Sequence, residues 1–201
     1  MDYIERNPDG RIIVFEGVDK AGKTTQSQML FDYLKSKWDP NKLALYSFPD
    51  YTSITGKEIK AYLQGMRDNF AIEWLHLLYA ANRYEHKAEL ESAIANGKII
   101  ILNRYFESNI VYGYSRGMDE EWLFNLDRFM PEPDVTIILD VPISESNLRN
   151  DNPDKNESNS QYMETVRRNF IKFSTKYNWT IIDGSGSKEK VHERVIAGID
   201  L

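Results

Sequence analysis

Five short apolar runs alternate with longer amphipathic segments along this chain. The runs are rich in Ile and Val, and such runs are typical of parallel strands that are covered on both faces. They are RIIVFE (11–16), LALYSF (43–48), KIIIL (98–102), VTIILD (135–140) and WTIID (179–183). Strands that alternate with helices predict a three-layer α/β fold, in which helices cover both faces of a central five-stranded parallel sheet.

Three of the segments between the runs place apolar residues at helical spacing, so each is predicted to form an amphipathic helix. These helices are expected over 23–38 (Met29, Leu30, Tyr33, Leu34), 71–97 (Leu75, Leu78, Ala81, with Gly97 as its end) and 161–177 (Val166, Phe170, Phe173). No internal repeat or linker is present, and the length suits one domain over 1–201. The polar stretch RNDNPDKNESNSQ predicts a mobile lid loop around 149–161.

Composition narrows the class of protein further. Lys and Arg total 25 against 31 Asp and Glu, and the resulting net charge of −6 argues against a nucleic-acid partner. There is no Cys, hence no disulfide or thiolate metal site, and the three His residues lack metal-ligand spacing. The acidic N-terminus is unlike a signal peptide, and no apolar run approaches the roughly 18 residues of a membrane span. We expect no membrane partner and a cytoplasmic location, or a nuclear one if the source is eukaryotic.

The stretch FEGVDKAGKTTQ (15–26) fits a phosphate-binding loop, because it follows a predicted strand and precedes a predicted helix. Gly17 and Gly22 allow positive φ angles that turn backbone N–H groups toward phosphate oxygens. Lys23 can reach the β and γ phosphates, and the Thr24 hydroxyl can ligate Mg²⁺. The expected ATP-binding loop comprises Gly17, Val18, Asp19, Lys20, Ala21, Gly22, Lys23, Thr24 and Thr25.

Loops of this kind serve kinases, GTPase switches and motor ATPases. A guanine-specific switch would carry Asn-Lys-x-Asp after a later strand, but the only Asn-Lys pair, Asn41-Lys42, is followed by Leu and Ala. Motors are usually larger, and little of this chain remains for a track-binding surface. A small kinase, which needs a loop, an acceptor pocket and a lid, is the favoured interpretation.

Three further stretches resemble an acceptor site: SFPDY (47–51), LLYAANRYEH (77–86) and LNRYFESNIVYGYSRG (102–117). The first and third follow predicted strands, and ligands of open α/β sheets bind at the carboxyl ends of strands. Together with the phosphate loop and MPEPD before the fourth run, these motifs resemble those of thymidylate kinases over nearly the whole chain. The resemblance implies a P-loop kinase fold, and transfer of the ATP γ-phosphoryl group to dTMP with Mg²⁺ as cofactor. Members of the family are commonly homodimers.

The resemblance also implies roles for residues of the phosphate loop and of the acceptor motifs. Asp19 is expected to accept a hydrogen bond from the sugar 3′-hydroxyl, and Arg104 to hold the acceptor phosphate. Lys20 stands where one subgroup of the family has a basic residue that reaches the transferred phosphoryl group. With Lys23 these residues form the expected catalytic set, and Mg²⁺ is expected at Thr24 through the bound nucleotide.

For the acceptor, the resemblance implies that Tyr79 stacks on thymine and Arg83 bonds a base carbonyl. Asn109 is expected to face the base, and Tyr112 to pack beneath the deoxyribose. The expected dTMP-binding set is Asp19, Phe48, Tyr51, Tyr79, Arg83, Arg104, Ser108, Asn109 and Tyr112. Each role has a structural alternative: core packing for Tyr79, ion pairs for Arg83 and Arg104, a packed helix face for Tyr112, and a loop cap for Asp19.

The chain departs from the family pattern at two places. Asn103 stands where the family has an Asp linked to Mg²⁺ or its waters; either Glu16 or Asp140 takes over, or metal affinity and turnover are lowered. The lid is poor in arginine, and Arg149, with Lys155, is expected to close over ATP there. This lid fits the subgroup whose basic residue lies in the phosphate loop.

Other functions stay open at this point. One is a kinase for another deoxynucleotide or for a deoxynucleoside. Another is a nucleotide-gated binding protein, which ATPase activity indifferent to every nucleoside monophosphate would favour. A third is a degenerate kinase retained as a binding subunit, for which Asn103 is the only motive.

Overall fold

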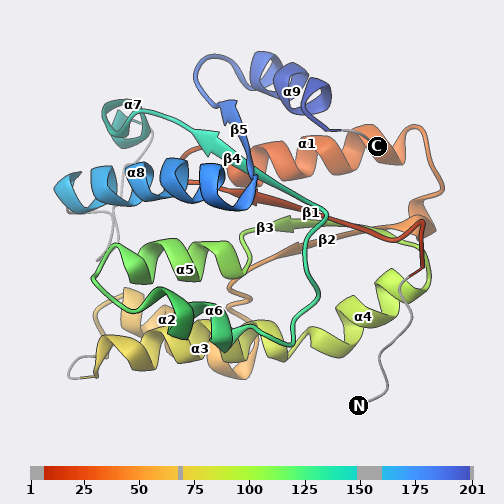
Figure 1. Cartoon of the computed structure of the whole chain (residues 1–201). Coiled ribbons are helices and arrows are strands. Elements are labelled where there is room, and N and C mark those ends of the chain that lie inside the picture. Colours follow the sequence, from red (N-terminus) through yellow and green to blue (C-terminus); the bar gives the residue numbers. More distant parts are fainter. Residues whose placement is uncertain (1–6, 68–69, 149–159, 200–201) are drawn as a thin grey trace.

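The computed structural model describes residues 7–67, 70–148 and 160–199. At its centre lies a parallel sheet with the strand order β2-β3-β1-β4-β5 (Figure 1). The strands are β1 (Arg11–Glu16), β2 (Leu43–Ser47), β3 (Ile99–Asn103), β4 (Val135–Asp140) and β5 (Thr180–Asp183). Every neighbouring pair is parallel, with Ile13, for example, between Ile101 and Val135. The predicted five-stranded α/β fold is therefore confirmed.

The helices pack on both faces of this sheet. They are α1 (Lys23–Lys35), η1 (Pro40–Lys42), α2 (Ile54–Leu63), α3 (Ile72–Tyr84), α4 (Lys87–Ala95), α5 (Phe106–Tyr114), α6 (Glu120–Leu126), α7 (Ile143–Leu148), α8 (Ser160–Tyr177) and α9 (Lys188–Ala197). In Figure 1, α1 and α9 lie on one side of the sheet, whereas α4 and α5 lie on the other. Helix α8 packs against β4 and α5.

Strand alternation explains this layering. Ile13 and Phe15 of β1 point to the face covered by α1 and α9, and they belong to one apolar core. Ile12 and Val14 point to the opposite face, where a second core includes Leu90 of α4. These side chains are fully buried or nearly so, and burying each apolar side chain of this size stabilises the fold by about 1.5–3 kcal/mol.

All strands end at one edge of the sheet, since they are parallel. There β1 continues into the phosphate loop, β2 into the 48–53 loop and β3 into α5. Backbone bonds join these exits: Phe48 N donates to Asn103 O (3.0 Å), and Arg104 N donates to Phe15 O (2.9 Å). The phosphate loop and the two acceptor motifs that follow strands, 47–51 and 102–117, are thereby brought to one edge.

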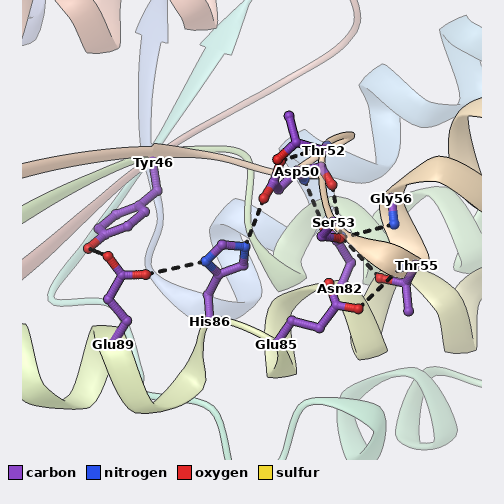
Figure 2. Close-up of polar contacts among 10 residues, drawn as sticks. All are labelled: Tyr46, Asp50, Thr52, Ser53, Thr55, Gly56, Asn82, Glu85, His86 and Glu89. Atoms are coloured by element: carbon purple, nitrogen blue, oxygen red, sulfur yellow. Dashed lines mark hydrogen bonds and ion pairs between the residues drawn. The ribbon is translucent and has the colours of Figure 1, made fainter.

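The prediction of one long helix over 71–97 is wrong. Helices α3 and α4 are separated at Glu85 and His86, where His86 leaves helical geometry (φ −101°, ψ 0°). The His86 ring packs edge-on against Tyr46 and Phe48, and its Nε2 lies 3.2 Å from Asp50 Oδ2 (Figure 2). The break lets the chain follow the end of β2, while the apolar pattern runs through it and does not mark it.

Other predicted bounds need smaller changes. The helix expected over 23–38 ends at Lys35, and the helix expected over 161–177 begins one residue earlier. Most of the expected lid, including Arg149 and Lys155, lies outside the described residues. Within the described ranges, no helix combines the length and apolar composition needed to cross a membrane.

Candidate active site

Two cavities meet at the carboxyl edge of the sheet. The loop cavity, of about 930 Å³, follows the phosphate loop and the 47–52 segment and extends to Gly184 and Lys188. The helix cavity, of about 110 Å³, lies between α3 and α5. The residues that line both are Asp19, Phe48, Pro49, Tyr51 and Arg104. A ligand in one cavity can thus reach a ligand in the other across this shared wall.

The phosphate loop is folded around the Lys23 ammonium. Lys23 is only 6% exposed and donates to the carbonyl oxygens of Gly17 (3.0 Å) and Val18 (2.7 Å). Gly17 has φ 130°, and a Cβ there would lie 2.6 Å from the Leu139 carbonyl oxygen, so no other residue fits without a backbone shift. Residues 19–25 of the predicted ATP loop line the loop cavity, whereas Gly17 and Val18 lie behind it and hold Lys23.

Four predicted residues form one polar cluster in the wall between the cavities. The Arg104 guanidinium pairs with the Asp19 carboxylate and donates through Nη1 to Ser108 Oγ (3.1 Å). The Tyr112 hydroxyl donates to Asp19 Oδ2 (2.9 Å), and burial raises the pKa of Tyr112, which keeps that hydroxyl protonated. Arg104 has φ 66°, an uncommon backbone conformation for a side chain of this size. The structure therefore brings Asp19, Arg104, Ser108 and Tyr112 together.

Glu16, at the end of β1, anchors the start of α5. Its buried carboxylate accepts from the amides of Tyr105 (2.7 Å) and Ser108 (3.1 Å) and from the Ser108 hydroxyl. Burial raises the pKa of Glu16, against the opposing effect of Arg104. Glu16 is thus occupied by α5 and does not replace the family's Asp as a metal-linked carboxylate.

Asp140 does not replace it either. Its carboxylate is paired with the Arg167 guanidinium through two hydrogen bonds of 2.6 and 2.9 Å. Asn103 lies at the end of β3, where the family has Asp, and its Nδ2 donates to Thr24 Oγ1 (3.0 Å) and Ser47 Oγ (2.8 Å). Both carboxylates suggested as substitutes are therefore bonded to other groups, and Asn103 is the side chain that lies beside Thr24.

The surroundings of Asn103 fit a magnesium ion held together with a nucleotide. Asn103 Oδ1 is buried without a hydrogen-bond partner among the described residues, and the Thr24 hydroxyl lies beside the same amide. Amide and hydroxyl oxygens are ligands that Mg²⁺ accepts, and Mg²⁺ usually keeps waters and substrate phosphates in its shell. No cluster of three or more His, Cys, Asp or Glu that could hold a metal occurs in the described part of the chain. The protein therefore offers neutral oxygens rather than a carboxylate cage.

The helix cavity contains the residues predicted to contact the base and the deoxyribose. Tyr79, Arg83, Asn109 and Tyr112 all line it, and half-buried Tyr79 is not part of either apolar core. Arg83 is 3% exposed and pairs with Asp127 through Nε (2.7 Å) and Nη2 (2.6 Å). Arg83 therefore forms the structural ion pair that was the alternative to a role in binding the base. Its Nη1 group is not one of the two that bond Asp127.

The 48–53 loop is fastened to α3 by Asn82, which sequence reasoning missed (Figure 2). Asn82 is fully buried; its Oδ1 accepts from Asp50 N (2.8 Å), and its Nδ2 donates to Asp50 O (3.2 Å) and Ser53 Oγ (2.8 Å). This loop carries Phe48, which is 4% exposed, and Tyr51, which is 42% exposed at the shared wall. Asn82 directly precedes Arg83, a predicted site residue, and this neighbourhood in the sequence could have drawn attention to it.

A second missed residue is His76, which the sequence offered only as an isolated histidine. It lies on α3, three residues before Tyr79, and is 2% exposed in the wall of the helix cavity. Its Nδ1 lies 2.6 Å from Asn109 Oδ1. Spacing of three residues on one helix face could have drawn attention to it. Arg116 and Tyr162 also line the cavity and were not predicted.

Glu107 is a buried carboxyl whose ionisation should affect stability. Burial and the neighbouring Glu16 raise its pKa from 4.5 to about 8, and its Oε1 accepts from Thr136 Oγ1 (2.8 Å). Because the folded-state pKa is raised, its contribution to the free energy of unfolding is complete below pH 4.5 and is lost as the pH rises toward 8. For this single group, the slope of the free energy of unfolding is at most about 1.4 kcal/mol per pH unit.

The variant Glu107→Gln keeps an acceptor for Thr136 and removes this titration. Urea unfolding at about pH 5 and about pH 8.5 should show the variant gaining stability relative to the wild type only at the higher pH. An equal difference at both pH values would show that Glu107 is ionised alike in the folded and unfolded states.

The chain is similar in sequence to one family of known proteins over most of its length. The family model described as Thymidylate kinase matches residues 15–195. Thymidylate kinase of Schizosaccharomyces pombe is 34% identical over 193 residues, which cover 93% of this chain and 90% of that protein. Thymidylate kinase of Plasmodium falciparum is 31% identical over 188 residues, with 93% and 88% covered.

Solved structures of thymidylate kinases are also similar to this chain in fold. The thymidylate kinase from Candida albicans superposes with a TM-score of 0.81 at 27% identity, covering 94% of this chain and 90% of that one. The thymidylate kinase from Ehrlichia chaffeensis superposes with a TM-score of 0.76 at 26% identity, covering 94% and 98%.

Proposed function

This chain belongs to the thymidylate kinase family and is an ATP-dependent phosphotransferase acting on dTMP, and we propose that ATP binds in the loop cavity and dTMP in the helix cavity. The observation that carries this proposal is the shared wall of Asp19 and Arg104 between the two cavities. In this proposal, the end of a triphosphate on the loop lies opposite the end of a monophosphate between α3 and α5. The products are dTDP and ADP.

Phosphoryl transfer in this arrangement depends on alignment and charge. The acceptor is a phosphate monoester that is largely ionised near neutral pH, so no strong general base is needed. Arg104 fixes the acceptor phosphate, while Lys23 and Lys20 neutralise the charge that develops on the transferred group. In the structure, Arg104 forms an ion pair with Asp19. The acceptor phosphate then shares the Arg104 guanidinium with the Asp19 carboxylate. The same carboxylate accepts a hydrogen bond from the sugar 3′-hydroxyl.

We propose that Thr24 and Asn103 hold Mg²⁺ with the nucleotide, Thr24 through its hydroxyl and Asn103 through its amide oxygen or a water. When bound, the ion screens the phosphate oxygens and orients the triphosphate. For the base, Tyr79 provides a stacking surface worth about 1–3 kcal/mol and Arg83 donates to a carbonyl. Tyr112 packs beneath the deoxyribose and leaves no room for a 2′-hydroxyl.

We also propose a homodimer that acts in the cytoplasm. The exposed Leu77 of α3, at 48% exposure, supplies apolar surface for such a contact between subunits.

The function is tested by ADP release from Mg-ATP in a coupled assay with a panel of acceptors. The panel contains dTMP, dUMP, dCMP, dGMP, AMP, the ribose analogue of dTMP, and thymidine as a control without phosphate. Preference for dTMP, rejection of the ribose analogue and no reaction with thymidine are expected. Reaction with thymidine would instead indicate a nucleoside kinase, and ATPase activity indifferent to all acceptors would indicate a nucleotide-gated binding protein.

Lys20→Gly should depress turnover far more than ATP affinity. Lys20 lines the loop cavity in a left-handed conformation (φ 60°), which Gly adopts without strain, so the variant removes the charge and not the loop. Steady-state kcat and the Kd of ATP are measured on the same preparation. Turnover equal to the wild type would remove Lys20 from the catalytic set.

Asn103→Asp should lower the Mg²⁺ concentration needed for half-maximal activity by about tenfold, because a carboxylate binds Mg²⁺ more strongly than an amide. Nucleotide binding should depend on Mg²⁺ in the same way, and titration of Mg²⁺ at fixed ATP measures both. Unchanged Mg²⁺ dependence would show that position 103 does not act on the metal. A silent wild type that the substitution activates would identify Asn103 as the cause of a degenerate site.

A further inference from the structure

The side-chain amide of Asn109 is held at both ends inside the helix cavity. Its Nδ2 lies 3.2 Å from the backbone carbonyl oxygen of His76, and its Oδ1 lies 2.6 Å from His76 Nδ1. Asn109 is 3% exposed and His76 is 2% exposed, so water does not compete for these contacts. A backbone carbonyl only accepts hydrogen bonds, and the atom facing it must therefore be the NH₂ group.

This orientation also determines the hydrogen on the His76 ring. Since the amide oxygen only accepts, Nδ1 must carry a hydrogen and donate it to Asn109 Oδ1. Burial lowers the pKa of His76 to about 4, and the nearby Arg116 and Arg83 act in the same direction. Near neutral pH the ring is thus uncharged, with its single N–H directed at Asn109.

Each end of the Asn109 amide keeps one further capacity for bonding. The oxygen has a second lone pair, and the nitrogen has a second hydrogen. Asn109 lines the helix cavity together with Tyr79 and Arg83, so these groups face the same ligand. Arg83 adds only N–H donors, because a guanidinium cannot accept.

A fixed amide distinguishes two classes of pyrimidine. In a keto pyrimidine such as thymine, N3 carries a hydrogen, which the Asn109 oxygen can accept. In an amino pyrimidine such as cytosine, N3 is an unprotonated acceptor and would face that oxygen lone pair to lone pair. An amide that could rotate by 180° would serve either base, whereas an amide held by His76 serves only the first.

We propose that His76 is a specificity-determining positioning residue, which holds the Asn109 amide between its backbone carbonyl and its Nδ1–H and thereby locks this amide for the N3–H of a keto pyrimidine. The inference rests on the proposed function, in which the helix cavity holds the base of the acceptor. According to this inference, amino pyrimidines are rejected because His76 fixes the orientation of the Asn109 amide.

The test compares binding of dTMP and 5-methyl-dCMP, which differ only at C4 and N3. Calorimetry gives both Kd values for the wild type, His76→Leu and His76→Asn. The Leu side chain is similar in size and cannot donate, whereas the Asn amide nitrogen can occupy the place of Nδ1. Because each ratio is taken within one protein, a partly unfolded variant leaves it unchanged.

The wild type should prefer dTMP by at least about 100-fold, because a site built for one hydrogen-bonding pattern rejects the other. His76→Leu should reduce this preference by about tenfold or more, and His76→Asn should retain it within about threefold. The dTMP-to-dUMP ratio should stay constant, since the 5-methyl group is not on this edge. His192→Leu, a histidine on α9 that lines neither cavity, should leave every ratio unchanged.

An unchanged preference in His76→Leu would overturn the inference, and so would a wild type that binds both nucleotides alike. Equal weakening of both ligands in His76→Leu would assign His76 a purely structural role and would also overturn it. Binding does not require turnover, so these results are distinct from a failure of the proposed function, which would show as absent transfer from ATP to bound dTMP.

Discussion

Replacing Lys23 with Met is expected to lower kcat by about 10³-fold or more. The Lys23 ammonium is held by the Gly17 and Val18 carbonyls in the wall of the loop cavity, in which we propose that the triphosphate binds. Met preserves most of the side-chain length but carries no charge. A positive clamp of this kind on the transferred group contributes about 10³-fold or more to the rate of phosphoryl transfer.

The measurement is kcat with saturating Mg-ATP and dTMP, together with the Kd of dTMP. Lys23 does not line the helix cavity, so the dTMP affinity should stay within about twofold of the wild type. Lys35→Met, at the exposed other end of α1, is the matched control and should keep full turnover. A Lys23→Met enzyme with kcat within tenfold of the wild type would contradict the assignment of ATP to this loop.

Replacing Arg104 with Leu is expected to raise the KM for dTMP by about 100-fold or more, and to raise the KM for ATP much less. Arg104 offers a planar fork that suits phosphate, and hydrogen bonds to charged groups are each worth about 1.5–3 kcal/mol. Its loss also leaves the Asp19 carboxylate without its cation, and that charge would repel the acceptor phosphate. The lost hydrogen bonds act on the monophosphate, whereas the Asp19 charge faces both cavities and acts on both substrates.

The double variant Arg104→Leu with Asp19→Asn separates these two effects, because it removes the uncompensated carboxylate. Part of the lost dTMP affinity should return in it. Arg168→Leu, an exposed arginine on α8, is the control for a loss of surface charge. If the KM for ATP rose as much as the KM for dTMP, Arg104 would belong to the ATP site rather than to the acceptor site.

Local patterns in the sequence were enough to predict the five strands, the phosphate loop and the fold class. The strands were predicted within one or two residues, because each is a short apolar run, and the three central strands β1, β3 and β4 are buried along almost their whole length. The phosphate loop could be placed because its glycines and Lys23 lie within a few residues of one another, where local geometry decides. The order of the acceptor motifs led to the family, and the comparisons confirm it.

Contacts between distant parts of the chain could not be predicted in this way. The pairing of Arg83 with Asp127 joins residues 44 positions apart. The break between α3 and α4 depends on His86 meeting Asp50 from another element, and apolar periodicity runs through it. The roles assigned to the site residues stay predictions, and the variants described above test them.

The most direct measurement of the central claim uses a bisubstrate compound, in which adenosine and thymidine are joined through a chain of phosphates. If the two cavities hold ATP and dTMP end to end across Asp19 and Arg104, the compound should bind once per chain, compete with both substrates, and bind more tightly than either. Competition with only one substrate, or simultaneous binding of dTMP and the compound, would contradict the arrangement proposed for this site.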